Sequence, residues 1–109
     1  MTKKELNKIK TIHIGDKDIY HWTMVEGKSI IMPILLESSK KLVKDNLDSI
    51  KCLRVEAIIR GEQKAFDFFV KREELSDTLS KIMDWAIEEE EYEMCNEIKI
   101  LHQKYTEYF

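Results

Sequence analysis

The sequence is short of the residues that break or cross-link a chain. Its 109 residues contain three glycines and one proline, too few for flexible linkers, so a single domain over residues 1–109 is expected. The scarcity of glycine also argues against a phosphate-binding loop, because such loops need several glycines close together. The two cysteines, Cys52 and Cys95, form no CxxC pair and are expected to be reduced, buried thiols.

An excess of positive charge and long apolar runs are also missing. The net charge is −3, whereas nucleic-acid-binding proteins usually carry a basic excess, because phosphate neutralisation supplies most of their non-specific affinity. No segment approaches the ~18 apolar residues of a membrane span, and Met1–Leu6 lacks the apolar core of a signal peptide. These absences predict a cytoplasmic protein with no membrane partner.

The sequence contains no grouping of residues typical of catalysis. No Ser-His-Asp or Cys-His arrangement is visible, so we expect neither an enzyme nor a cofactor. His13 and His21 would lie on one face of a predicted hairpin, but two imidazoles make only part of a zinc site, which needs three or four protein ligands. No bound metal is therefore predicted, and a metal-dependent enzyme that uses these histidines is the least favoured hypothesis.

Alternating and β-branched patterns in the first third of the chain predict strands. Residues 9–14 and Ile19–Val25 flank a turn at Gly15–Lys17, which is typical of a hairpin. The apolar run Ser29–Leu36 predicts a third strand. Pro33 places this strand at a sheet edge or a bulge, because proline cannot donate a hydrogen bond to a ladder.

A helix and a second hairpin are expected next. Ser38 or Ser39 can cap a helix that continues to Ile50. Lys51–Arg60 and Lys64–Lys71 then alternate apolar and polar residues on either side of a turn that begins at Gly61, so they predict an antiparallel hairpin.

The last third of the chain is expected to be helical. Two apolar stripes run through it at helical spacing, and the second stripe is rotated from the first by more than helical drift explains. Glutamates four residues apart in the run Glu88–Glu93 would also repel on a continuous helix. We therefore predict helices over residues 73–88 and 92–106, paired antiparallel with a turn near Glu90. The alternative is one long helix, whose apolar stripe would need a second chain to cover it.

These elements predict an α+β fold. Residues 9–71 would form an antiparallel sheet of about five strands with one middle helix, and residues 72–109 would form a C-terminal helical region. The expected order is strand, strand, strand, helix, strand, strand, helix, helix. Residues 1–8 are expected to be a frayed arm.

Residues 79–101 resemble the UVR motif. The positions that match its pattern are Leu79, Met83, Ala86, Tyr92, Glu93 and Ile98. Cys95 stands where alanine is usual, Lys99 where arginine is usual, and Ile100 where the motif has aspartate. The motif is a helical hairpin found in the excision-repair proteins UvrB and UvrC and in regulators of Clp ATPases. The resemblance covers about a fifth of the chain and implies a hairpin that docks on protein partners.

The leading hypothesis is a small non-catalytic interaction or regulatory domain, of the size expected for a bacterial or phage inhibitor or adaptor. It would dock on a protein partner, or on a second copy, through its acidic C-terminal helices, since aromatic anchors dominate interface energies and charge steers association. The candidate contact residues are Trp85, Glu89, Glu90, Glu91, Tyr92 and Glu93.

The alternative hypothesis is a nucleic-acid-binding accessory protein. Exposed aromatic side chains can stack on bases. The cluster of basic residues near the N-terminus that would contact phosphates consists of Lys3, Lys4, Lys8 and Lys10.

Overall fold

A computed structural model describes residues 10–108, with side chains as far as Tyr105. The predicted N-terminal arm, residues 1–8, lies outside this range. The elements follow in the order β1 (Lys10–Gly15), α2 (Ile19–His21), the π-helical turn η1 (Trp22–Glu26), α3 (Lys28–Lys44), β2 (Ser49–Ile59), β3 (Glu62–Lys71), the 3-10 turn η2 (Arg72–Glu74), α4 (Leu75–Glu88) and α5 (Tyr92–Tyr108).

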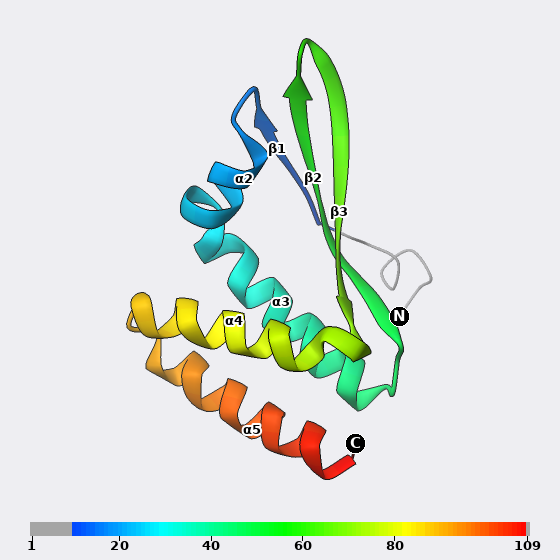
Figure 1. Cartoon of the computed structure of the whole chain (residues 1–109), viewed down its shortest axis with the longest axis vertical. Coiled ribbons are helices and arrows are strands. Elements are labelled where there is room, and N and C mark those ends of the chain that lie inside the picture. The colour runs from blue at the N-terminus through cyan, green and yellow to red at the C-terminus, as the bar shows by residue number, and fades with distance from the viewer. Residues whose placement is uncertain (1–9, 109) are drawn as a thin grey trace.

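The sheet has three strands in the order β1-β2-β3. β1 runs parallel to β2, and β2 runs antiparallel to β3. α3 packs against β2 and β3, α4 crosses α3, and α5 lies antiparallel beside α4 (Figure 1). The tip of the β2–β3 hairpin extends beyond the helices (Figure 1). The fold is α+β, but the prediction of an antiparallel sheet of about five strands is wrong, because the sheet is three-stranded and mixed.

The errors lie between Ile19 and Ile50. Ile19–Val25 forms α2 and most of η1 instead of a strand, so the first predicted hairpin does not exist. Ser29–Leu36 belongs to α3, which ends at Lys44 instead of Ile50. The predicted order of elements is wrong for the same reason, since two expected strands are helical.

The first half of α3 was predicted as a strand because this helix is covered from two sides. It packs on the sheet and on α4, and its buried residues are Ile31, Met32, Leu36, Ser39 and Leu42. A helix covered on two sides has no simple polar stripe, and a short apolar run cannot be distinguished from a buried strand by periodicity. Pro33 is exposed in the second turn of α3, where its lack of an N–H removes one i→i−4 hydrogen bond from the helix.

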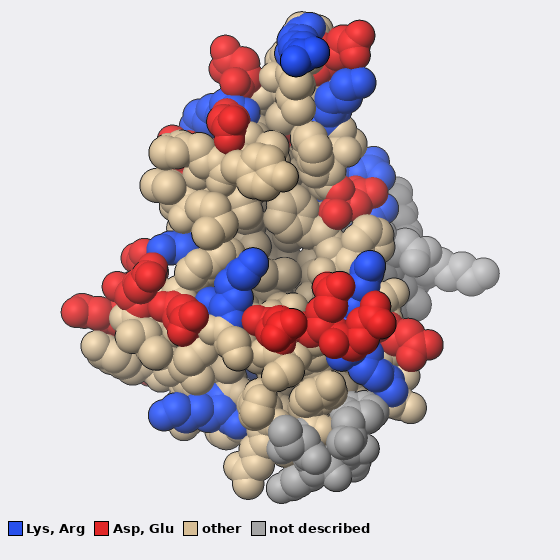
Figure 2. Space-filling view, in the orientation of Figure 1, with Lys and Arg blue, Asp and Glu red and all other residues tan. Residues whose placement is uncertain are grey.

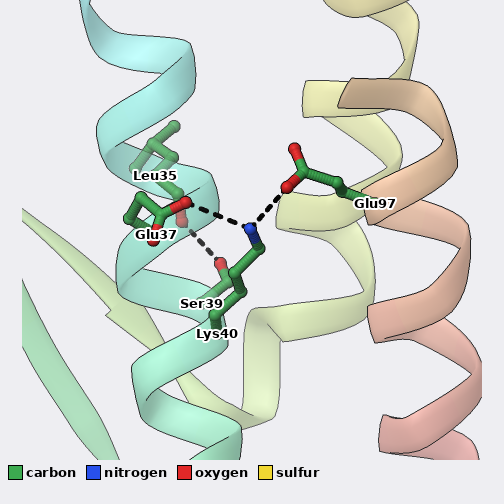
Figure 3. Close-up of polar contacts among 5 residues, drawn as sticks. All are labelled: Leu35, Glu37, Ser39, Lys40 and Glu97. Carbon is green, nitrogen blue, oxygen red and sulfur yellow. Dashed lines mark hydrogen bonds and ion pairs between the residues drawn. The ribbon is translucent and has the colours of Figure 1, made fainter. Parts of the chain in front are cut away.

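The serine expected to cap a helix lies in the middle of one. Ser39 is fully buried, and its hydroxyl donates a hydrogen bond of 2.7 Å to the carbonyl oxygen of Leu35 (Figure 3). This bond to the carbonyl of residue i−4 satisfies the hydroxyl within the helix. The prediction of a helix cap at Ser38 or Ser39 is therefore wrong.

The second predicted hairpin is confirmed. β2 and β3 pair antiparallel, with Leu53 opposite Phe68 and Val55 opposite Phe66. Arg60 (φ 53°) and Gly61 (φ 79°) form the turn, and two successive positive φ values are typical of the type I′ turn that suits hairpin twist. Leu53 and Val55 are fully buried, so this hairpin supplies the centre of the core.

The predicted C-terminal helical hairpin is also confirmed. α4 ends at Glu88 and α5 begins at Tyr92, so the chain reverses direction at Glu89–Glu91. Ile82, Ala86 and Ile98 are buried in the core.

A lysine of α3 also connects the hairpin to the rest of the fold. The Nζ atom of Lys40 lies 2.9 Å from Glu97 of α5 and 3.1 Å from Glu37 of α3 (Figure 3).

No helix in the described range is long and apolar enough to cross a membrane.

Candidate functional site

The turn between α4 and α5 carries most of the predicted contact residues. We call Glu88–Glu91 and Glu93 the acidic turn. All five of these side chains are exposed. Acidic side chains gather at the end of the molecule where α4 turns into α5, on the left in Figure 2. Because no basic side chain occurs between Lys81 and Lys99 in the sequence, the acidic turn has no cation of its own.

The hydrogen bonds of the turn are those of a Schellman motif. The amide of Glu91 donates to the carbonyl of Ala86 (2.8 Å), and the amide of Glu90 donates to that of Ile87 (3.1 Å). Glu90 has φ 57°, the left-handed conformation that this motif requires and that usually selects glycine. The end of α3 has the same bonds, with Asn46 (φ 54°) in the left-handed position.

Two of the five glutamates are held by a lysine of α3. The Nζ atom of Lys28 lies 2.9 Å from an oxygen of Glu88 and 3.5 Å from one of Glu89. The hydrogen bond to Glu88 raises the pKa of Lys28. A cation at the C-terminal end of α4 also interacts favourably with the dipole of that helix. Lys28 therefore fixes the acidic turn against the first turn of α3.

The other three glutamates have no such partner. Within residues 10–108, Glu90, Glu91 and Glu93 form no ion pair. Their charges are close together, exposed and uncompensated. They can therefore attract a basic partner at a distance, while their carboxylates stay hydrated until the partner makes contact.

Trp85 and Tyr92, the two predicted aromatic anchors, lie in different environments. Trp85 is 7 % exposed and belongs to the hydrophobic core, so it supports α4 from within and offers no surface. Tyr92, at the start of α5, is 66 % exposed. Ile87, which the sequence reasoning missed, is 54 % exposed at the end of α4. The available apolar anchors at the acidic turn are thus Tyr92 and Ile87.

The basic and aromatic residues of the nucleic-acid hypothesis are not gathered on the described surface. Lys3, Lys4 and Lys8 lie outside the described residues, and Lys10 is exposed at the start of β1. Phe69 is 49 % exposed on the sheet face that carries charged side chains.

The cations near Phe69 are already paired. Lys51 is opposite Phe69 in the sheet, and it lies 3.2 Å from Asp67. Arg54 donates to the same carboxylate at 2.8 Å. The hydrogen bond from Arg54 holds the pKa of Asp67 below its usual value. This face of the sheet therefore presents few unpaired cations to phosphate.

The residues considered for metal or thiol chemistry are separated. His13 lies on β1 with its Nδ1 atom 3.0 Å from Glu56, and His21 lies at the end of α2, so the expected pairing on one hairpin face is wrong. No group of three His, Cys, Asp or Glu residues in the described range could hold a metal ion. Cys52 and Cys95 are buried and form no disulfide, and burial raises the pKa of the Cys52 thiol.

An open groove of about 490 Å³ lies between α4 and α5. Its apolar lining comes from Leu79, Met83 and Ile98, and its polar lining comes from Ser80, Asp84, Lys99, His102 and Gln103. His102 is exposed beside this groove.

Comparison with known proteins gives no match. No family model matches the sequence, and neither a curated protein nor a solved structure matches the chain.

Proposed function

We propose that this chain is a non-catalytic protein-interaction or regulatory domain that docks on a protein partner through the acidic turn. The observation that carries the proposal is the exposed Tyr92 beside three glutamates that no cation of the described chain neutralises. Aromatic side chains are enriched at the centres of protein interfaces, and charged side chains around them attract a partner of opposite charge. The acidic turn has this composition.

The distribution of charge along the chain supports the same reading. Residues 73–93 hold nine acidic side chains and one lysine, a net charge of −8, so the remainder carries +5 to give the total of −3. A patch of one sign raises the association rate of a partner of opposite sign. The resemblance of residues 79–101 to the UVR motif implies the same use of the hairpin, and it stays a prediction because no comparison tests it.

Trp85 does not belong to this proposal, because it is buried. The contact residues that we propose are therefore Ile87, Glu90, Glu91, Tyr92 and Glu93.

The test compares two variants with the same change of charge. In the first, Glu90→Lys, Glu91→Lys and Glu93→Lys reverse the acidic turn. In the control, Asp16→Lys, Asp45→Lys and Asp48→Lys reverse three exposed carboxylates far from it in sequence. Partner capture from a cell extract, identified by mass spectrometry, should be lost at the acidic turn and kept in the control. Each charge should contribute about 0.2–1 kcal/mol at an exposed rim, so the three together predict a loss of roughly three- to a hundredfold.

Tyr92→Ala tests the anchor separately. Removal of a central aromatic side chain should weaken capture by about tenfold or more, and thermal unfolding should change little because the side chain is exposed. Capture that survives both the charge reversal and Tyr92→Ala would show that the acidic turn is a solvated loop.

A further inference from the structure

Four large apolar side chains lie exposed within one short segment. Tyr20 is 81 % exposed, Val25 58 %, Met24 51 % and Ile30 40 %. They fall between α2 and the first turn of α3, and they are four of the ten large apolar side chains exposed in the described chain. We call these four residues the apolar shelf. Clustering of exposed apolar side chains is typical of an interaction surface.

The side chains of the apolar shelf face solvent because Trp22, which lies among them in the sequence, points into the core. Trp22 is 5 % exposed and belongs to the core. Gly27 lies directly against the Trp22 ring, since a Cβ atom there would stand 2.6 Å from a ring carbon. The Gly27 amide also donates to the Trp22 carbonyl, which closes the π-helical turn. This packing holds the turn and directs the neighbouring side chains to solvent.

The apolar shelf adjoins the acidic turn. The ion pairs from Lys28 to Glu88 and Glu89 bring the start of α3 beside the end of α4. In Figure 2 an uncharged surface extends over α2, η1 and the beginning of α3, and acidic side chains border it where α4 turns into α5. The Lys28 side chain is only 15 % exposed, so the cation at the boundary is largely covered.

We propose that the apolar shelf and the acidic turn together bind a basic amphipathic helix of the partner. The helix would place its apolar stripe on Met24 and Val25 and its lysines or arginines beside Glu90 and Glu91. Such helices carry apolar residues at i, i+3, i+4 and i+7 next to basic residues, and they dock in surfaces of complementary character. This inference rests on the proposed function, and it adds the chemistry of the partner and a second contact surface.

The charge of the surface decides between kinds of partner. Nucleic acid and anionic membranes both carry negative charge, so the acidic turn would repel them. A basic peptide is attracted by the acidic turn and gains burial of apolar area on the shelf. The combination therefore favours a basic helix over the other occupants of an apolar patch.

The test uses the full chain and a defined probe. The probe is a fluorescent 18-residue peptide of leucine and lysine with leucines at helical spacing. Its control has the same composition in an order that destroys the apolar stripe. Fluorescence anisotropy should give saturable binding of the amphipathic peptide and at least about tenfold weaker binding of the control. Backbone amide shifts on binding should map to residues 20–30 and 87–93.

Matched variants separate the two surfaces. Met24→Asp with Val25→Asp should weaken binding of the peptide by about tenfold or more. Ile58→Asp with Ile100→Asp is the control, because these side chains are similarly exposed, 46 % and 48 %, elsewhere on the molecule, and this control should bind the peptide normally. Anionic vesicles should not bind the wild-type chain.

The failure of this inference can be told apart from failure of the proposed function. If capture of the native partner requires Tyr92 and the acidic turn but is unchanged by Met24→Asp with Val25→Asp, the helix proposal is overturned and the proposed function stands. Equal binding of the two peptides, shifts confined to the groove between α4 and α5, or stronger binding to anionic vesicles would each overturn the helix proposal. If capture survives both reversal of the acidic turn and Tyr92→Ala, the proposed function itself is overturned.

Discussion

Replacement of Glu90 by glycine should stabilise the fold. Glu90 occupies the left-handed position of the turn after α4, with φ 57°. In this conformation the Cβ atom of an L-residue crowds the backbone, and glycine avoids that crowding. The hydrogen bonds of the turn use backbone atoms of Glu90 and Glu91, so the Glu90 side chain can be removed without the loss of a hydrogen bond or ion pair within the described chain.

The magnitude follows from two opposing contributions. The left-handed conformation costs a non-glycine residue about 1–2 kcal/mol, and glycine gives back about 0.5–1 kcal/mol through the greater freedom of the unfolded chain. Glu90→Gly should therefore raise the free energy of unfolding by about 0.5–1 kcal/mol. For a domain of this size that corresponds to an increase in melting temperature of roughly 3–6 °C.

Two neighbouring variants isolate the cause. Glu90→Gln removes the charge and keeps the side chain, so it should change stability by only a few tenths of a kcal/mol, about the effect of one exposed like-charge contact. Glu89→Gly introduces glycine at a residue with φ −90°, where glycine relieves no strain, and it also removes the 3.5 Å ion pair to Lys28, so it should destabilise. Urea unfolding of the three variants measures these differences. A Glu90→Gly variant no more stable than Glu90→Gln would refute the assignment of strain to this position.

Three further predictions concern the packing and electrostatics of the fold. Gly27→Ala should lower the free energy of unfolding by about 1–3 kcal/mol, because the new methyl group would overlap the Trp22 ring. Most of this loss should vanish when Trp22 is also replaced by leucine. A stabilising Gly27→Ala would show that the ring lies elsewhere. The stabilising effect of the lowered Asp67 pKa should be fully present above the pKa of aspartate in the unfolded chain, about 3.9, and should be lost as the pH falls through the folded pKa. Urea unfolding should therefore show the wild type more stable than Asp67→Asn, by a margin that shrinks below about pH 4. A margin that stays constant down to about pH 2 would contradict this. Spin labels at Ser80 and Gln103, which line the same groove, should lie within about 20 Å of each other, because packed helices are ~10 Å apart and the label linkers add to that distance. A separation of about 35 Å, from 23 residues at 1.5 Å rise, would indicate one continuous helix.

The parts of the fold that the sequence predicted correctly are those whose buried residues recur at a regular spacing. β2 and β3 alternate because one side packs on α3 and the other meets solvent. α4 packs on both α3 and α5, but its buried residues Leu75, Leu79, Ile82 and Ala86 still recur at helical spacing. In these segments local pattern and tertiary environment agree, so periodicity identifies the element.

The segment predicted wrongly has a pattern set by tertiary contacts. α3 is apolar on two sides because it lies between the sheet and α4. The residues of α2 and η1 are rich in aromatic and β-branched types that favour strands, yet only Trp22 among them is buried. The alternation that suggested a strand there reflects an exposed apolar surface, which propensity alone cannot separate from a buried sheet face.

The candidate site was partly accessible to sequence reasoning. The glutamate run and Tyr92 were identifiable because acidic residues repel on a helix and an aromatic residue followed the break. The burial of Trp85 depends on how α4 crosses α3, which no local pattern encodes. The apolar shelf was missed because Ile19–Val25 was assigned to a strand of a hairpin that does not form. Exposure of these side chains becomes apparent only from the path of the chain through η1.

The lysines of α3 neutralise only part of the negative charge of the helical hairpin. Lys28 and Lys40, both from α3, hold Glu88, Glu89 and Glu97 of the helical hairpin. Stability alone would then favour uncharged residues or a glycine at the three remaining positions of the turn, because like charges repel and Glu90 stands in a left-handed conformation. Local rules are usually broken at functional sites. A left-handed glutamate between an exposed isoleucine and an exposed tyrosine is such a break, and the basic partner that we propose would offset the repulsion among these glutamates.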